Sequence, residues 1–100
     1  EKRDIYRAAK TYATLFLANL SYDGGSYKVS KDWLQNSVFD SKDAKRLRPQ
    51  VLYNLARAAE ALGETDLAVE SLEAIEGPMA PGAKLRAQRV KAEADKKAEE

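Results

Sequence analysis

The chain has 100 residues and a formal net charge of +1; 33% of its residues are charged, 44% are hydrophobic, and it contains neither cysteine nor histidine. This length allows one small domain, and the missing residue types exclude disulfides and thiolate metal sites and remove the commonest general base, so we expect no metal and no cofactor. The near-neutral charge gives no reason to expect nucleic acid as a partner, and no apolar run approaches the ~20 residues that would insert in a membrane.

Ala, Glu, Lys, Leu and Arg dominate the composition, which favours an all-α fold. The first twenty residues predict a helix, because apolar residues recur at helical spacing without proline or glycine. Between Ala13 and Leu20 these residues occupy more than one side, so we expect the helix to be buried against both its own hairpin partner and the next hairpin. The apolar residues are Ile5, Ala8, Ala9, Tyr12, Ala13, Phe16, Leu17 and Leu20.

Two consecutive glycines, Gly24 and Gly25, predict a turn, because glycine tolerates the positive backbone angles that a tight turn requires. A short helix follows, with Ser30 as its expected N-cap. Trp33 is expected to face the first helix and to be buried in the core. The first hairpin therefore covers about residues 4–39.

The segment 40–48 is expected to be a linker. Pro49 fits the first turn of a following helix, so we favour a break before it over one long kinked helix. Phe39 and Leu47 are expected to pack the linker against the core. Lys42, Lys45, Arg46 and Arg48 form a basic cluster that could contact phosphates, but interleaved aspartates favour a solvated linker instead.

Residues 49–76 predict a second antiparallel hairpin. Gly63 separates two amphipathic helical runs, and Gly77 with Pro78 ends the second run. Two helices joined by so short a turn pack antiparallel. The apolar positions are Val51, Leu52, Leu55, Ala59 and Leu62 in the first run and Leu67, Ala68, Leu72 and Ile75 in the second.

The order Leu52-Tyr53-Asn54-Leu55-Ala56, then Gly63, then Ala68 resembles one tetratricopeptide repeat. In that family, small residues allow the two helices of a repeat to approach closely. The resemblance implies that Ala56 and Ala68 lie at this close contact. It also implies that the two TPR-like hairpins form a segment of a right-handed α-solenoid.

The first hairpin can be aligned with the second at an offset of 38 residues, with Gly25 placed on Gly63. This alignment places Ser30 on Ala68. Tetratricopeptide repeats usually recur at ~34 residues, so the extra residues are expected in the linker.

A C-terminal helix is predicted over about 82–96 from its strong helix formers. Its apolar side is thin and consists of Leu85, Val90 and Ala92. Terminal repeats in stacked helical proteins need a polar outer face, so we expect this helix to cap the domain.

No arrangement of residues in the sequence indicates catalysis, and we expect no catalytic residues. The acids of the second hairpin fall on exposed faces at helical spacing, no histidine can activate a serine, and Gly24 with Gly25 lacks the sequence of a phosphate-binding loop. A non-catalytic piece of an enzyme is the least favoured interpretation.

The family resemblance implies that the first helix of each pair lines a concave groove. An aromatic, amide and basic lining would suit an extended and acidic peptide. Asn19 and Asn54 fall where tetratricopeptide domains of chaperone partners carry carboxylate-binding asparagines, although Leu15 stands where a basic residue is usual. A solvent-facing amide is an equal alternative for the asparagines, and partial burial is one for the tyrosines. The candidate partner-binding residues are Tyr12, Asn19, Tyr53, Asn54, Arg57, Lys84, Gln88 and Lys91.

The sequence therefore predicts a non-enzymatic protein-interaction module. The alternative is a structural or self-assembling segment of a larger repeat protein, in which exposed Ile5, Tyr6 and Val90 would matter more than the groove. Because the sequence begins at Glu1 without a methionine or a signal peptide, we expect a piece of a longer protein or a processed form.

Overall fold

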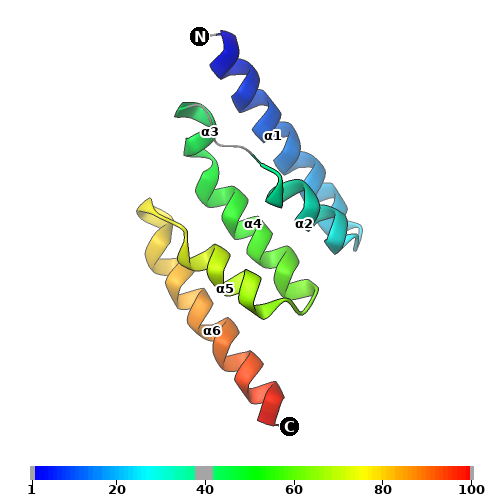
Figure 1. Ribbon diagram of the computed structural model, residues 1–100, viewed down its shortest axis with the longest axis vertical. Helices are drawn as coiled ribbons and strands as arrows, with labels where there is room; N and C mark the ends of the chain where they lie inside the picture. The colour runs from blue at the N-terminus through cyan, green and yellow to red at the C-terminus, as the bar shows by residue number, and fades with distance from the viewer. Residues whose placement is uncertain (1, 38–41, 100) are drawn as a thin grey trace.

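A computed structural model describes residues 2–37 and 42–99, and all regular secondary structure in these ranges is helical, as predicted (Figure 1). There are six α-helices and one short 3₁₀ helix within the described part. The α-helices are α1 (Lys2–Asp23), α2 (Tyr27–Gln35), α3 (Lys42–Arg46), α4 (Arg48–Ala61), α5 (Thr65–Glu73) and α6 (Ala80–Glu99), and the 3₁₀ helix η1 is Gly77–Met79.

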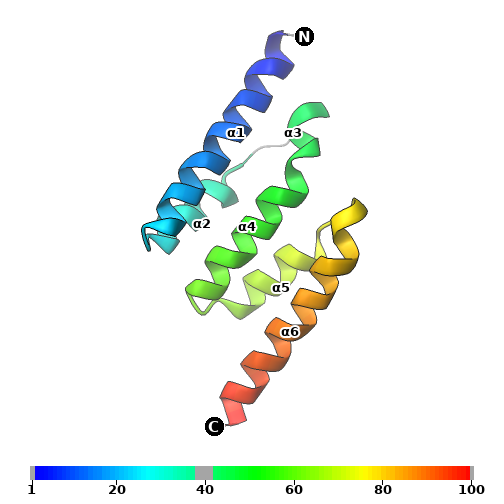
Figure 2. The same cartoon turned by 180° about the vertical axis from the view of Figure 1, so that it is seen from behind.

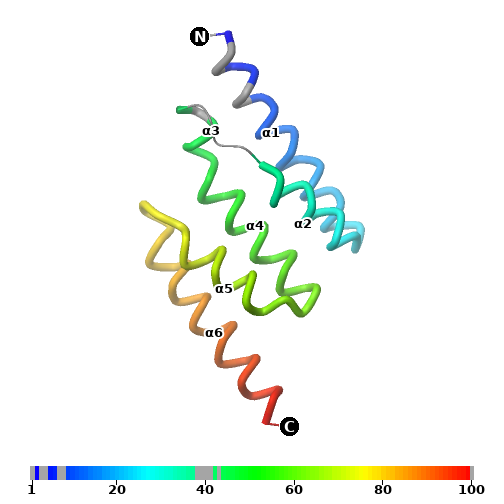
Figure 3. Tube along the Cα trace, in the orientation of Figure 1, coloured from blue at the N-terminus to red at the C-terminus, as the bar shows by residue number. Residues whose placement is uncertain are grey.

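The helices form two layers. α1, α4 and α6 lie on the side seen from the front in Figure 2, whereas α2 and α5 lie on the side seen from the front in Figure 1. The trace in Figure 3 advances along the longest dimension, so that α1 and α6 lie at opposite ends of a molecule measuring 54 × 29 × 16 Å. Each helix therefore packs mainly against helices that are near it in the sequence.

Helix α1 is buried on one side only. Thr11, Leu15 and Ala18 face the core, where Leu15 and Ala18 pack with Leu34 of α2. The opposite side, which includes Phe16, is exposed. The prediction that α1 is covered on more than one side is therefore wrong for this structure, because nothing in the described chain lies against that second side.

Helix α2 begins earlier than predicted. Ser26 precedes its first turn, so the assignment of Ser30 as N-cap is wrong, and Ser30 is instead buried inside the helix. The early start follows from the turn, where Gly25 adopts a φ of 83° and allows the chain to reverse at once. Trp33, predicted in the core, is 43% exposed on the outer side of α2.

The predicted break before Pro49 is confirmed. α3 ends at Arg46, α4 begins at Arg48 with Pro49 in its first turn, and Leu47 between them is half-buried against the core. The Arg48 guanidinium donates a hydrogen bond of 3.2 Å to the Ala74 carbonyl, which joins the start of α4 to the end of α5. The predicted packing of Phe39 falls outside the described residues.

The second helix pair has most of the core that the sequence predicts, but the prediction is wrong for Leu62, which is 38% exposed at the end of α4. Ala56 and Ala59 of α4 and Ala68 of α5 are almost fully buried in one cluster, together with Leu72. These small side chains allow α4 and α5 to approach closely. Leu55 belongs to a second cluster, which faces α1 and α2.

The two helix pairs share their backbone geometry at the predicted offset. Gly25 and Gly63 both have positive φ, 83° and 76°, and their amides donate hydrogen bonds of 3.0 Å to the Tyr22 and Glu60 carbonyls respectively. The amides of the next residues, Ser26 and Glu64, donate hydrogen bonds of 2.8 and 2.9 Å to the carbonyls of Ser21 and Ala59. These bonds complete a Schellman motif in each pair. α2 and α5 begin and end at equivalent positions, and Ser30 and Ala68 are both buried.

Helix α6 is longer than the predicted 82–96. It starts at Ala80 and continues to Glu99, with Pro81 and Gly82 inside its first turn. Proline is tolerated there because the first amides of a helix have no partner inside the helix.

The buried side of α6 is made of small residues. Ala83, Ala87 and Val90 pack into the core, whereas Leu85 is 54% exposed and Ala92 is also exposed. The predicted apolar side is therefore wrong for Leu85 and Ala92, and Val90 is not an exposed residue as the self-assembly alternative supposed.

None of the helices in residues 2–37 and 42–99 combines the length and apolarity needed to cross a bilayer. The same residues contain no cluster of three or more acidic groups that could hold a metal ion.

Candidate functional site

The structure separates the predicted partner-binding residues into four groups. Tyr53 and Arg57 line a shared cleft, Asn19 and Asn54 contact each other, and Tyr12 lies on the exposed side of α1. The other three, on the exposed surface of α6, are Lys84, Gln88 and Lys91.

Asn54 is engaged inside the molecule. Only 5% of it is exposed; its Nδ2 donates a hydrogen bond of 3.2 Å to Asn19 Oδ1, and its Oδ1 accepts one of 2.9 Å from Gln50 Nε2. These bonds satisfy a largely buried amide and connect α1 to α4. In this arrangement, Asn54 holds the two helix pairs in register instead of presenting its amide to a ligand.

A second feature, the tyrosine–arginine cleft, joins α1, α4 and α6. Its volume is about 580 Å³, and it is open at the surface. Tyr53 and Arg57 were predicted, but no pattern in the sequence indicated that residues from the end of α1 or from this flank of α6 lie beside them. The cleft is lined by Tyr22, Tyr53, Arg57, Glu60, Ala61, Arg86 and Arg89.

The α1 and α4 sides of the cleft are connected by stacked groups. The Arg57 guanidinium carbon lies 4.2 Å from the centre of the Tyr22 ring, in the geometry of a cation–π contact. Tyr22 in turn meets Tyr27 edge to face, with ring centres 5.1 Å apart. Arg57 Nε is buried without a hydrogen-bond partner, so the guanidinium is held mainly by the ring. This stack links the first helix pair to α4.

The α6 side of the cleft is positively charged. Arg86 donates a hydrogen bond of 2.6 Å to Glu60 Oε1, which connects α6 to α4. Arg89 forms no ion pair with any residue in the described ranges. Three guanidinium groups and one carboxylate therefore line the cleft, and their net positive charge favours anionic ligands.

The lysines of α6 lie on its other flank. Lys84, Gln88 and Lys91 recur at helical spacing on one flank of α6. Arg86 and Arg89 are each two residues from one of these lysines, and this spacing places them on the opposite flank. Lys91 Nζ forms a 2.8 Å ion pair with Glu73 of α5.

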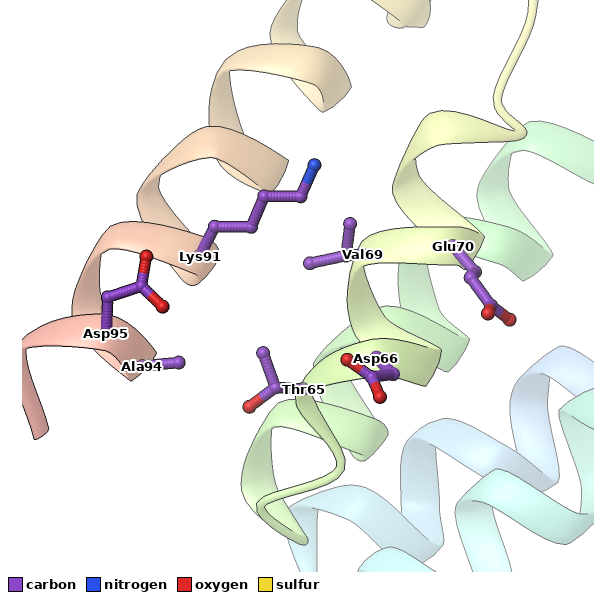
Figure 4. A pocket seen from close by; sticks show the side chains of 7 residues that line it. All are labelled: Thr65, Asp66, Val69, Glu70, Lys91, Ala94 and Asp95. Atoms are coloured by element: carbon purple, nitrogen blue, oxygen red, sulfur yellow. The ribbon is translucent and has the colours of Figure 1, made fainter. Parts of the chain in front are cut away.

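Lys91 belongs to a separate feature, the α5–α6 groove, of about 310 Å³. In Figure 4 its side chain extends toward α5 beside Val69, while Glu70 points to the other side of α5. Acidic groups outnumber the one lysine here, so this groove is poorly suited to an acidic ligand. Its lining residues are Thr65, Asp66, Val69, Glu70, Lys91, Ala94 and Asp95.

The basic cluster of the predicted linker lines a third cleft, of about 610 Å³, between α3, the start of α4 and η1. Lys45, Arg46 and Arg48 contribute to it, together with Glu76. Arg48 is held by the Ala74 carbonyl, so part of this basic cluster has a structural role.

Comparison of the chain with protein-family models, with curated proteins and with solved structures gives no match.

Proposed function

We propose that the chain is a non-enzymatic protein-interaction module that holds an acidic peptide segment in the tyrosine–arginine cleft. The observation that carries this proposal is the meeting of Tyr22, Tyr53 and three arginines, from α1, α4 and α6, around one open cleft. The resemblance of 52–68 to a tetratricopeptide repeat supports it, since the first helices of such repeats line the peptide-binding side.

The chemistry of the lining indicates the kind of segment. Guanidinium groups form bidentate, charge-assisted hydrogen bonds with carboxylates, and tyrosine rings offer flat apolar surface with a polar edge. Arg86 already forms an ion pair with Glu60, so Arg57 and Arg89 would supply the larger part of the attraction for a bound carboxylate. A segment in which carboxylates alternate with apolar side chains matches both components.

Preorganisation favours binding. The Arg57–Tyr22–Tyr27 contacts, the Arg86–Glu60 ion pair and the Asn54–Asn19 hydrogen bond hold the helices around the cleft. Side chains that are already ordered lose less conformational entropy when a ligand arrives. The cleft would therefore accept a segment with little rearrangement of the backbone.

The proposed architecture is two TPR-like antiparallel hairpins and a capping helix, which together form part of a right-handed α-solenoid. The shared geometry of the Gly25 and Gly63 turns and the burial of Ala56 and Ala68 support it. The exposed lysines and glutamine of α6 suit the polar outer face of a terminal helix.

The test is titration calorimetry with a short extended peptide of alternating Glu and Leu, and with a counterpart that carries Lys in place of Glu. We expect the acidic peptide to bind and the basic one not to bind. Added salt should weaken the interaction because the contacting charges are partly exposed. Arg57→Ala and Arg89→Ala should each raise the Kd about tenfold, equivalent to about 1.4 kcal/mol.

Lys84→Ala is the matched control, because it removes a cation from the other flank of α6 and should leave the Kd unchanged. Circular dichroism would show that each variant keeps its helices. Equal binding of the two peptides, or equal effects of Arg89→Ala and Lys84→Ala, would contradict the proposal.

A further inference from the structure

The outer side of α1 is apolar, exposed and continuous over the length of the helix. Phe16 is 64% exposed and Tyr12 61%, and the exposed series extends from Ile5 to Leu20 with Ala9 and Ala13 between the large residues. Their spacing of three and four residues places them on one face, opposite the buried Leu15 and Ala18. We call this series Ile5, Ala9, Tyr12, Ala13, Phe16 and Leu20 the α1 stripe.

The second helix pair shows how exposed the equivalent positions are when another helix pair packs against them. At the offset that superimposes the two turns, Leu17 corresponds to Leu55 and Leu20 to Ala58. Leu55 is 6% exposed and Ala58 0%, whereas Leu17 is 40% and Leu20 55% exposed. The side that α4 buries against the first pair is therefore the side that α1 leaves uncovered.

The same relation holds between α2 and α5. Leu67 of α5 is half-buried and packs against the cluster that contains residues of α1 and α2, and Ser71 is buried. Their equivalents on α2, Val29 and Trp33, are exposed. The apolar surface beside the α1 stripe thus continues onto α2, and the whole end of the molecule has the character of an interior face.

The α1 stripe is complementary to itself when it is reversed. A twofold axis that passes between Tyr12 and Ala13 sets two copies of α1 antiparallel and places large residues opposite small ones near the centre, which is how packed helices interlock. The same axis brings Lys2 of one copy near Asp23 of the other, where opposite charges attract. From the centre outward, the facing pairs are Tyr12 with Ala13, Phe16 with Ala9, and Ile5 with Leu20.

We infer that the α1 stripe is the interface of a symmetric homodimer in which a second copy of this chain lies antiparallel along α1. The opposite end of the molecule favours this closed arrangement over head-to-tail growth. The exposed surface of α6 carries mainly polar and charged side chains such as Lys84, Gln88 and Lys91, and Leu85 is its only exposed large apolar residue, so α6 has no apolar series that matches the length of the stripe. An interface that uses the same surface twice closes after two subunits.

Sedimentation velocity over a concentration series tests this inference. We expect the wild-type chain to pass from monomer to dimer as its concentration rises. Phe16→Asp, which places a charge inside the stripe opposite Ala9 of the second copy, should raise the dimer Kd at least tenfold. Leu85→Asp is the matched control, since Leu85 is a similarly exposed apolar residue on α6, and it should leave the Kd unchanged.

A wild-type chain that stays monomeric throughout the series would overturn the inference. This result is expected if another protein or a further helix, and not a second copy, covers the stripe. Equal loss of dimer in Phe16→Asp and Leu85→Asp would also overturn it, because the interface would then not be specific to α1. Helical circular dichroism of Phe16→Asp distinguishes lost association from lost folding. The inference is independent of the proposed peptide binding, since monomeric Phe16→Asp should still bind the acidic peptide.

Discussion

The two helix pairs are alike in backbone and different in environment. Gly25 and Gly63 make the same turn with the same hydrogen bonds, yet Leu55 is buried and its equivalent Leu17 is exposed. Local sequence therefore determines where each helix begins and how each turn closes. The presence of a neighbouring helix pair determines whether an apolar face belongs to the core or to the surface. The apolar outer side of α1 is exposed because no helix of the described chain packs against it.

The largest expected effect is the loss of stability when Leu55 is truncated, compared with the same truncation at the equivalent Leu17. Leu55→Ala should lower the free energy of unfolding by ~2–5 kcal/mol, because it leaves a cavity between the two pairs. Leu17→Ala should lower it by less than ~1 kcal/mol, because Leu17 is already partly hydrated. Urea unfolding measures both, in the Phe16→Asp background so that association does not contribute. Similar losses at the two sites would mean that the two faces are not in different environments.

Overfilling the α4–α5 contact should give the next largest effect. Ala68→Leu should destabilise the protein by ~1–3 kcal/mol, because Ala68 is fully buried beside Ala56 and Ala59. Ala61→Leu on the exposed side of α4 is the control and should change stability little, since Leu and Ala have similar helix propensities. Thermal unfolding that shows no difference between the two variants would place Ala68 away from the contact.

The two turn glycines should respond alike. Gly25→Ala and Gly63→Ala should each lower the free energy of unfolding by ~1–2 kcal/mol, because an L-residue is strained at positive φ. The added Cβ meets no atom within 4 Å at either position, so backbone strain is the only source of the loss. Clearly different losses in urea unfolding would show that the turns are not equivalent.

The smallest effect should come from the ion pair that links the two helix pairs. Lys31 Nζ lies 2.9 Å from Glu64 Oε1, but the Glu64 side chain is 42% exposed. Lys31→Met should therefore lower stability by less than ~1 kcal/mol, and high salt should reduce the difference from wild type. A loss that is larger than this and insensitive to salt would show that the ion pair is shielded from solvent, since methionine largely preserves the aliphatic stem of Lys31 and removes its charge.

The elements of this fold could be predicted from the sequence because their signals are local. Glycine at the end of each hairpin helix and Pro49 at the start of α4 gave the breaks, and the three-and-four spacing of apolar residues gave the helices. The burial of Ala56 and Ala68 could be predicted as well, since small residues at a helix contact follow from the resemblance. The predicted start of α2 was wrong because serine is a favourable N-cap residue at both position 26 and position 30, and only the geometry of the preceding turn decides between them.

Burial and site composition were harder to predict, because both depend on what lies across from a helix. Periodicity showed that α1 is apolar on more than one side and placed Trp33 on the apolar side of α2, but it did not show whether anything would cover these residues. The cleft contains Arg86 and Arg89 instead of Lys84 and Lys91, because α6 packs through Ala83 and Ala87, and alanine gives a weak signal of orientation.

The most direct measurement uses the absence of cysteine in the chain. Single cysteines introduced at Lys2, Lys10 or Asp23 can carry spin labels, and pulsed dipolar spectroscopy then measures the distance between the two copies. An antiparallel pair centred between Tyr12 and Ala13 predicts similar separations of about 30–35 Å for labels at Lys2 and Asp23, and a separation under about 20 Å for labels at Lys10, from the helical rise of about 1.5 Å per residue and the usual distance between packed helices. No dipolar interaction at any of the three sites, or clearly unequal distances at Lys2 and Asp23, would show that a second copy does not cover α1 in this way.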